Sequence, residues 1–259
     1  MMNYFLAALY SEWLKIRKSK VIWMTAVAFT IAPLMAGFFM FVLKNPALAE
    51  RLGVIGAKAQ IVGEANWPAY VNLHAQIIAI GGIFVFGFVT SWIFGREYTD
   101  GTVKDLLALP YSRAIIVVAK FIASLVTNII LSAYIVTLGF FIGWLIELPQ
   151  WSLTTMLHGF YVLLIITILT AVLNTPVAFL ASLGRGYLAP LGFVMMTLVL
   201  SQIITVAGFG EYFPWAIPTL YSGITGESMI NGRGVLIIAF TSVLGFIATL
   251  YWWIYADHH

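Results

Sequence analysis

Long apolar stretches alternate with short polar ones along this chain. Six of them run for about 20 residues or more, the length that a helix needs to cross a bilayer. They lie at residues 21–43, 74–94, 115–146, 157–183, 187–208 and 236–256. The third and fourth exceed the minimum length, so we expect them to tilt, kink or extend beyond the lipid. The pattern predicts an all-α integral membrane protein with six transmembrane helices.

The basic residues between these stretches predict the orientation of the spans, because lysine and arginine are enriched on the cytoplasmic side. With the N-terminus inside, nine of the 13 lie on the inner side and four on the outer side. The inner residues are Lys15, Arg17, Lys18, Lys20, Arg96, Lys104, Arg113, Lys120 and Arg185, and the outer ones are Lys44, Arg51, Lys58 and Arg233. We therefore expect both termini to be cytoplasmic.

Residues 1–20 show helical periodicity, with an apolar and a polar side. The apolar side carries Leu6, Leu9, Tyr10, Trp13 and Ile16, and the polar side carries Ser11, Glu12, Lys15 and Lys18. A basic polar side opposite aromatic residues favours a helix that lies in the inner membrane interface. The alternative is a plain extension of the first span.

Composition agrees with a membrane protein. The 259 residues are 62% hydrophobic and 9% charged, against about one quarter charged in soluble domains. The absence of cysteine excludes disulfides and thiolate chemistry. The net charge of +3 is scattered along membrane-flanking segments, which argues against nucleic-acid binding. We expect one transmembrane domain over residues 1–259 and no metal site.

The external stretch 209–235 contains the aromatic and proline-rich sequence YFPWAIPTLYSGITGES. Such a segment can dip back into the membrane where it is packed in protein or lines a water-filled cavity. Its candidate residues are Phe213, Pro214, Trp215 and Pro218. A belt of aromatic residues at the membrane interface is the alternative, and both interpretations can hold together.

Between the second and third spans lies a dense polar insert, REYTDGTVKDLLALPYSR, at residues 96–113. Thr102 followed by Asp105 fits a capping box, and Gly101 provides a turn ahead of it. Pro110 disfavours helical geometry in the residue before it and ends the segment. The insert predicts a cytoplasmic helix of about two turns.

Val103, Leu106 and Leu107 share one side of this short helix. A helix of this length is not stable alone in water, so it needs a surface to dock against. The candidates are the lipid interface and a cytosolic partner.

The insert resembles the signature of type-2 ATP-binding-cassette (ABC) transporter permeases. The matching residues are Glu97, Gly101, Thr102, Leu106, Leu107, Pro110, Ser112 and Arg113. In that family the signature forms a coupling helix, which docks into a groove on a separate ATPase subunit. The order of interfacial helix, two spans, signature and four spans is also similar.

The resemblance implies how the insert would contact the ATPase. Val103, Leu106 and Leu107 would supply packing. Charged contacts at the rim would come from Glu97, Asp100, Lys104, Asp105 and Arg113. Arg185, in the short loop at 182–190, is a candidate second contact, or else a plain orientation signal.

The chain carries no G-x-x-x-x-G-K-[ST] motif, so ATP and Mg²⁺ are expected on the partner and no cofactor in this chain. The family resemblance implies two ATPase subunits and two permease copies, as a homodimer or a heterodimer, in a bacterial-type plasma membrane.

A second motif bears on the substrate: FPWAIP, at residues 213–218, resembles members of the family that export bacitracin or lantibiotic-type peptides. We expect a transport subunit that exports an amphipathic peptide, drug or lipid-like molecule and gives resistance. An ABC permease for ions or lipid-linked glycans is the alternative.

Polar residues inside the spans suggest a pathway or helix–helix contacts. Lys120, Ser124, Asn128 and Ser132 form one stripe on the third span, and Asn174 and Gln202 lie in later spans. A partly polar cavity for the substrate is the functional interpretation. Hydrogen bonding between helices is the structural one, worth about 0.6 kcal/mol each. We expect Lys120 to extend to the inner surface.

Two other classes of protein fit less well. An ion-coupled secondary carrier usually needs an acidic residue deep in a span, and the acidic residues lie outside the predicted spans. An intramembrane enzyme would need a motif such as H-E-x-x-H or G-x-S-x-G, and neither occurs.

Overall fold

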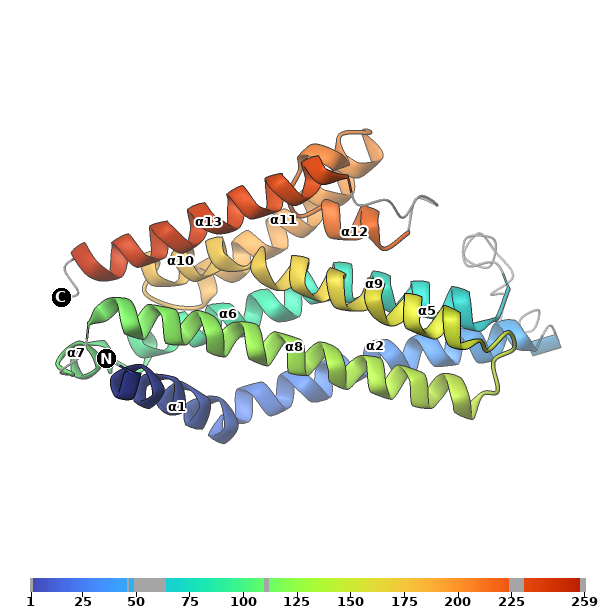
Figure 1. The fold of residues 1–259 in the computed structure, drawn as a ribbon, viewed down its shortest axis with the longest axis horizontal. Helices are drawn as coiled ribbons and strands as arrows, with labels where there is room; N and C mark the ends of the chain where they lie inside the picture. The colour runs from blue at the N-terminus through green and yellow to red at the C-terminus, as the bar shows by residue number, and fades with distance from the viewer. Residues whose placement is uncertain (1, 46, 49–63, 110–111, 224–230, 257–259) are drawn as a thin grey trace.

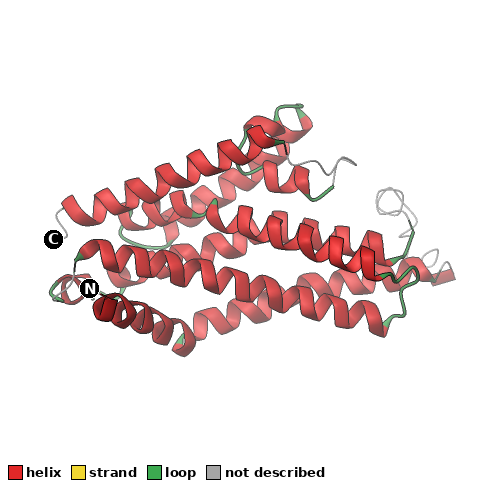
Figure 2. Ribbon diagram, viewed as in Figure 1, coloured by secondary structure: helices red, strands yellow, loops and turns green. Residues whose placement is uncertain are grey.

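The structure is a computed structural model. It describes the chain except for residues 1, 46, 49–63, 110–111, 224–230 and 257–259. The regular structure of the described residues is helical, without strands (Figure 2). Six helical segments in this part of the chain are long and apolar enough to cross a membrane. The predicted fold class, an all-α integral membrane protein, is therefore confirmed.

The six spans follow the predicted order along the chain (Figure 1). They are α2 (Lys20–Lys44), α5–η1–α6 (Trp67–Gln76, Ile77–Gly81 and Gly82–Thr99), α8 (Arg113–Leu145), α9–α10 (Leu153–Val172 and Thr175–Leu183), α11 (Leu188–Val206) and α13 (Gly232–Tyr255).

The second span begins earlier than its apolar stretch predicts. The side chain of Asn66 accepts a hydrogen bond from the Ala69 amide at 2.9 Å, and proline occupies the first turn of α5. Both features start helices, because they satisfy or remove amide groups that have no partner inside the helix. The span therefore starts at Trp67, seven residues before position 74, and contains one π-helical turn, η1.

The fourth span is broken, as its Asn-Thr-Pro sequence suggests. α9 ends at Val172, and α10 starts at Thr175 with Pro176 in its first turn. Thr175 Oγ1 donates a hydrogen bond to the carbonyl of Ser242 in α13 at 2.8 Å, so the break is held by the last span. Asn174, which precedes α10 at this break, is buried.

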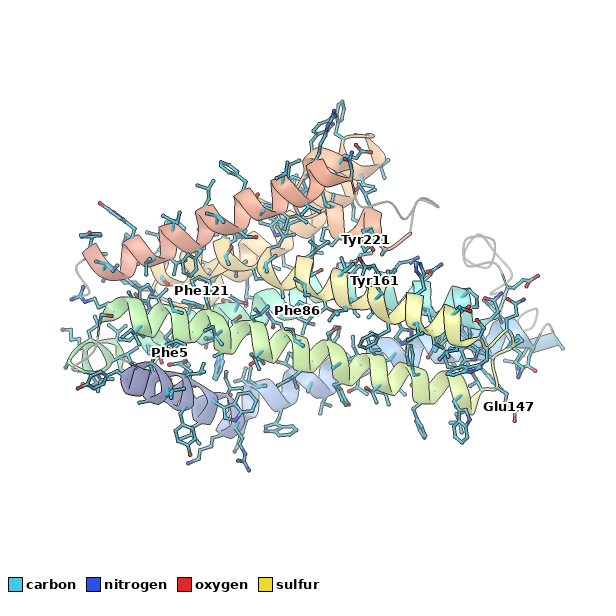
Figure 3. All side chains as sticks on the ribbon, in the orientation of Figure 1. Phe5, Phe86, Phe121, Glu147, Tyr161 and Tyr221 are labelled. Atoms are coloured by element: carbon cyan, nitrogen blue, oxygen red, sulfur yellow. The ribbon has the colours of Figure 1, made fainter. Side chains whose placement is uncertain are left out.

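The first and last described residues lie at the same end of the bundle, beside the short helix α7 (Val103–Leu107) (Figure 1). The helix α1 (Met2–Lys18) lies at this end against the first half of α8. At the opposite end, Lys44 Nζ donates hydrogen bonds to the carbonyls of Ile146 and Glu147 and so ties α2 to α8 (Figure 3).

The helix α1 is amphipathic, but part of its polar side turns inward. Leu6, Tyr10 and Trp13 are exposed, whereas Glu12 and Ile16 are buried against the bundle. The exposed apolar side suits contact with lipid. The inward direction of Glu12 was not predicted, because the sequence pattern alone does not show which side of α1 meets the other helices.

Candidate functional site

The signature glycine ends α6 and turns the chain into α7. Gly101 adopts the left-handed conformation with φ of 71°. The Thr102 amide donates a hydrogen bond to the Glu97 carbonyl at 2.9 Å, and the Gly101 amide donates to the Tyr98 carbonyl at 3.3 Å. This is a Schellman arrangement, in which glycine is favoured because it lacks a Cβ.

Thr102 stands at the N-cap of α7, but its side chain makes no capping hydrogen bond with the residues that the structure describes. The predicted capping box is therefore wrong. The cause is local geometry: Thr102 has φ −90° and ψ 3°, whereas capping side chains usually need an extended backbone. The stability of this short helix therefore depends on the surface against which it packs. Pro110, the predicted stop, lies outside the described residues.

The apolar side of α7 packs on this chain's own helices. Val103 is buried, and Leu106 and Leu107 are half-buried against the main core. Leu106 borders a small crevice together with Glu12 of α1 and Ile116 of α8. The expectation that this side of α7 packs on a partner does not hold for Val103, because the bundle already covers it.

Four charged side chains meet behind α7, where α1, α6 and α8 come together. Lys15 Nζ lies 2.7 Å from Glu12 Oε1 and 2.7 Å from Glu97 Oε1. Lys120 Nζ lies 3.2 Å from Glu12 Oε2 and 3.1 Å from Glu97 Oε2. Each carboxylate thus contacts both ammonium groups, and we call this arrangement the charge cluster.

Three of the four side chains in the charge cluster are buried, whereas the Lys15 side chain is 25% exposed. The exposed fraction is 0% for Lys120, 2% for Glu97 and 4% for Glu12. Lys120 also donates a hydrogen bond to the Ile93 carbonyl at 3.0 Å. Burial alone lowers the pKa of the Lys15 ammonium, but the carboxylates of Glu12 and Glu97 outweigh burial, so that the pKa is raised.

Two expectations are corrected by this cluster. Glu97 was predicted at the rim of a partner interface, and Lys120 was predicted to reach the inner surface, but both are buried. A buried ion is tolerated when opposite charges and hydrogen bonds surround it. The two lysines and two glutamates supply the opposite charges for each other, and all their contacts but one are also hydrogen bonds: Glu97 Oε2 is held by its ion pair with Lys120 and has no hydrogen bond among the described residues.

The residues after α7 connect it to the last span. The Ser112 side chain accepts a hydrogen bond from the Ile115 amide and starts α8. Arg113 Nη1 donates hydrogen bonds to the carbonyls of Trp253 and Ile254, at 3.3 and 3.1 Å. Arg113 therefore binds the C-terminal end of α13 in this structure.

Arg185 lies in the loop between α10 and α11, which packs on α6 close to the signature. Its φ is 50°, a left-handed conformation. Ser91 Oγ donates a hydrogen bond to the Tyr187 carbonyl at 2.9 Å. A Cβ at Gly95 would lie 2.6 Å from the carbonyl carbon of Gly186, so this loop and α6 are in direct backbone contact. The two segments predicted to face a partner thus lie at one end of the molecule.

The polar stripe of α8 faces the protein interior. Ser124 shares a hydrogen bond with Thr90 at 2.8 Å, and Ser132 shares one with Thr167 at 2.6 Å. These two serines join helices, as the structural interpretation expects. Asn128 lies between them, fully buried, and its amide has no hydrogen-bond partner within the described part of the chain.

The other two candidate pathway residues lie in different surroundings. Asn174 is buried, donates to the Thr170 carbonyl at 2.8 Å, and borders a cavity of about 150 Å³ beside Thr90. Gln202 is exposed on α11. The structure therefore does not bring Asn128, Asn174 and Gln202 together in one cavity of this chain.

The segment after α11 folds back against the bundle. It contains the short helices η2 (Gly210–Tyr212) and α12 (Ile217–Tyr221). Trp215 is buried with Val194 of α11 and Ile83 of α6, and its ring centroid lies 5.3 Å from that of Phe193. Pro218 is buried, while Phe213 and Pro214 are half-buried.

At its end this segment reaches α9, where Tyr221 lies near Tyr161 (Figure 3). Burial, and to a smaller extent the neighbouring Tyr161, raise the pKa of the Tyr221 hydroxyl. Residues 224–230 of the predicted external stretch lie outside the described residues.

Sequence reasoning missed the pairing of Glu12 and Lys15 with Glu97 and Lys120. A signal was present, because Lys120 stands in a strongly apolar span with no acidic residue one turn away. Such a lysine requires an acidic partner from another segment or a route to the surface. Sequence alone did not decide between these two.

The fold and these polar groups indicate a multi-pass helical membrane protein with a buried charge cluster behind a short helix at one end. Comparison with known proteins agrees and is more specific. Residues 8–203 match the family described as ABC-2 family transporter protein. The chain therefore belongs to the ABC-2 transporter family and is a permease subunit, which is not itself catalytic.

One relative is the bacitracin transport permease protein BCRB of Bacillus licheniformis. It is 27% identical to this chain over 193 residues, which cover 73% of this chain and 92% of the relative. This chain is thus similar to a bacitracin transport permease over most of the relative's length.

Proposed function

We propose that this permease is driven by a separate ATPase, which docks on α7 and the neighbouring exposed residues. It exports an amphipathic substrate, such as an antimicrobial peptide, a drug or a lipid-like molecule, and gives resistance to it. The similarity to a bacitracin transport permease supports this class of substrate.

The observation that carries the proposal is the way in which α7 packs on the bundle. Its apolar side is anchored on the bundle, whereas Lys104, Asp105 and Leu109 are exposed. Glu97, which precedes the turn at Gly101, is ion-paired to Lys15 of α1 and Lys120 of α8, so it cannot move alone. A force applied to α7 would therefore move α1, α6 and α8 together.

The revised docking surface consists of the exposed part of the signature. Its exposed members are Asp100, Gly101, Thr102, Lys104, Asp105, Ala108, Leu109 and Ser112, and the half-buried Leu106 and Leu107 border them. Arg185 is also exposed and belongs to the same end of the molecule. Charges at the rim of such a surface set partner choice and association rate more than affinity.

The wider assembly is part of the proposal. Two permease copies and two ATPase subunits would form the transporter, with ATP and Mg²⁺ on the ATPases and both permease termini in the cytoplasm. The exposed Gln202 supports a second permease beside α11, because a polar side chain that faces lipid is costly. In that position Gln202 would line a pathway between the two permeases.

The segment around Trp215 is the proposed external element for substrate handling. It packs into the bundle towards the end opposite to α7, beside α9, α11 and α13 (Figure 1). An ion-coupled carrier is less well supported, because the buried carboxylates of Glu12 and Glu97 are already paired with lysines.

Co-purification of the permease with a P-loop ATPase tests the proposal. Leu109→Asp and Lys104→Glu are expected to weaken the association, the first by about tenfold or more and the second mainly at low salt. Lys20→Glu is the matched control, because Lys20 is also exposed but lies outside the docking surface. Undiminished association of Leu109→Asp, or a permease that transports without any ATPase, would contradict the proposal.

A further inference from the structure

A basic groove lies between α1 and α6, beside the charge cluster. Its volume is about 560 Å³. The lining residues that matter here are Tyr10, Leu14, Lys15, Lys18, Trp92 and Arg96. The groove therefore combines three cationic side chains with aromatic and apolar ones.

The cations in the groove are not neutralised equally. Lys15 is engaged by Glu12 and Glu97. Arg96 stacks over the Trp92 ring at 4.6 Å, and its ion pair with the exposed Asp100 is long, at 4.0 Å. Lys18 is exposed and has no carboxylate within 4 Å in the part of the chain that the structure describes. Lys18 and Arg96 thus keep positive charge available for an anion.

The groove also lies at the level where α1 passes into the first span. Tyr10 and Trp13 of α1 are exposed, and α2 exposes Trp23 and Met24 within its first turns. Exposed aromatic residues at a span end are typical of the headgroup region of a bilayer. The cationic side chains are therefore placed at headgroup depth.

We propose that this groove binds the headgroup of an anionic phospholipid. Lys18 and Arg96 would hold the phosphodiester, since basic pockets between helices at a membrane surface favour anionic headgroups. Leu14 and Trp92 would contact the glycerol and the upper acyl chain. The proposal does not depend on ATPase docking, because none of these residues belongs to the exposed part of α7.

Native mass spectrometry of the full-length permease tests this site. The protein is taken from nanodiscs that contain equal amounts of phosphatidylglycerol and phosphatidylcholine. The wild type is expected to retain phosphatidylglycerol preferentially. The double variant Lys18→Gln/Arg96→Gln is expected to lose this preference by roughly 30-fold, which corresponds to about 1 kcal/mol for each cation.

The matched control is Arg17→Gln/Lys20→Gln, which removes the same charge from exposed positions that do not line the groove. This control should keep the preference. Glycerophosphoglycerol, the headgroup without acyl chains, should not displace the lipid, which distinguishes a lipid site from a simple phosphate site. Equal loss in both double variants, or no preference in the wild type, would overturn the proposal. If the groove variant fails to fold, the single variant Lys18→Gln is compared with the wild type instead. A weaker preference for phosphatidylglycerol supports the site, and an unchanged preference overturns the proposal.

Discussion

At the scale of single residues, the charge cluster is the least expected feature of this chain. An isolated ion in the protein interior costs several kcal/mol, and attraction between ions repays this only when every partner is well placed. Here each of the two carboxylates contacts both lysines. The cluster therefore holds α1, α6 and α8 in position relative to one another, because removing any member leaves the charges of the others unbalanced.

Lys120→Met is expected to destabilise the permease by about 3–5 kcal/mol, because Glu12 and Glu97 would keep a buried negative charge. Thermal unfolding of the detergent-solubilised protein measures this effect. Lys104→Met, which changes an exposed lysine, is the control and should change stability little. The double variant Lys120→Met/Glu97→Gln should recover part of the loss, and strictly additive losses would show that the two residues do not interact.

Asn128→Leu is expected to stabilise the permease, in contrast to Lys120→Met. Its buried amide has no partner among the described residues, so a leucine of similar size should stabilise the resting protein by about 1–3 kcal/mol, measured by thermal unfolding. Ser124→Ala removes a hydrogen bond to Thr90 and should be mildly destabilising. A lower unfolding temperature for Asn128→Leu would mean that its amide makes an interaction in the resting state.

At the scale of elements, α6 connects the span region to the signature through close backbone contact. Gly95 allows the loop between α10 and α11 to approach α6, and this loop carries Arg185. Gly101 then ends α6 and starts α7. Two glycines thus fix how the two polar loops lie at one end of the molecule.

Gly95→Ala is expected to destabilise the protein by about 1–3 kcal/mol, because the added Cβ would meet the backbone of Gly186. The control is Gly192→Ala in α11, where a Cβ meets nothing within 4 Å. Alanine there should be neutral or slightly stabilising, since it favours the helix. Equal unfolding temperatures for the two variants would show that the loop can move away at no cost.

At the scale of the whole molecule, the two candidate regions lie at opposite ends. The signature and the charge cluster occupy the end where the first and last described residues lie, and the segment around Trp215 lies towards the other (Figure 1). The proposed coupling of ATP hydrolysis to export requires these separate regions to communicate through the spans. Variants of one region should therefore leave binding at the other intact.

Trp215→Ala is expected to abolish resistance while ATPase co-purification persists. Trp215 is buried between helices, so its loss removes the packing that positions the segment around it. Trp215→Phe should keep part of the function, and Tyr212→Ala, at a side chain that is 65% exposed, should keep nearly all of it. Full resistance in Trp215→Ala cells would exclude a role for this segment.

Local features of the sequence predicted a large part of this structure. The apolar stretches predicted the six spans and their order, and the excess length of the fourth predicted a tilt, a kink or an extension, which the structure realises as a break before Pro176. Such features can be recognised in one continuous stretch of sequence, because a span needs about 20 consecutive apolar residues and the effect of a proline is confined to a turn or two. The capping box at Thr102 was a local prediction that failed, because its backbone is not extended.

The order of residues was enough to specify the class of fold, the number of spans and the place of the signature, because apolar length and turn residues are local properties. It did not specify that Glu97 and Lys120 face inward, or that Val103 packs on its own bundle. Glu12 and Lys120 are 108 residues apart in the chain, so their contact depends on how α1 and α8 pack. Which side of a helix meets another is a property of the whole assembly of helices, and it emerges only when they pack together.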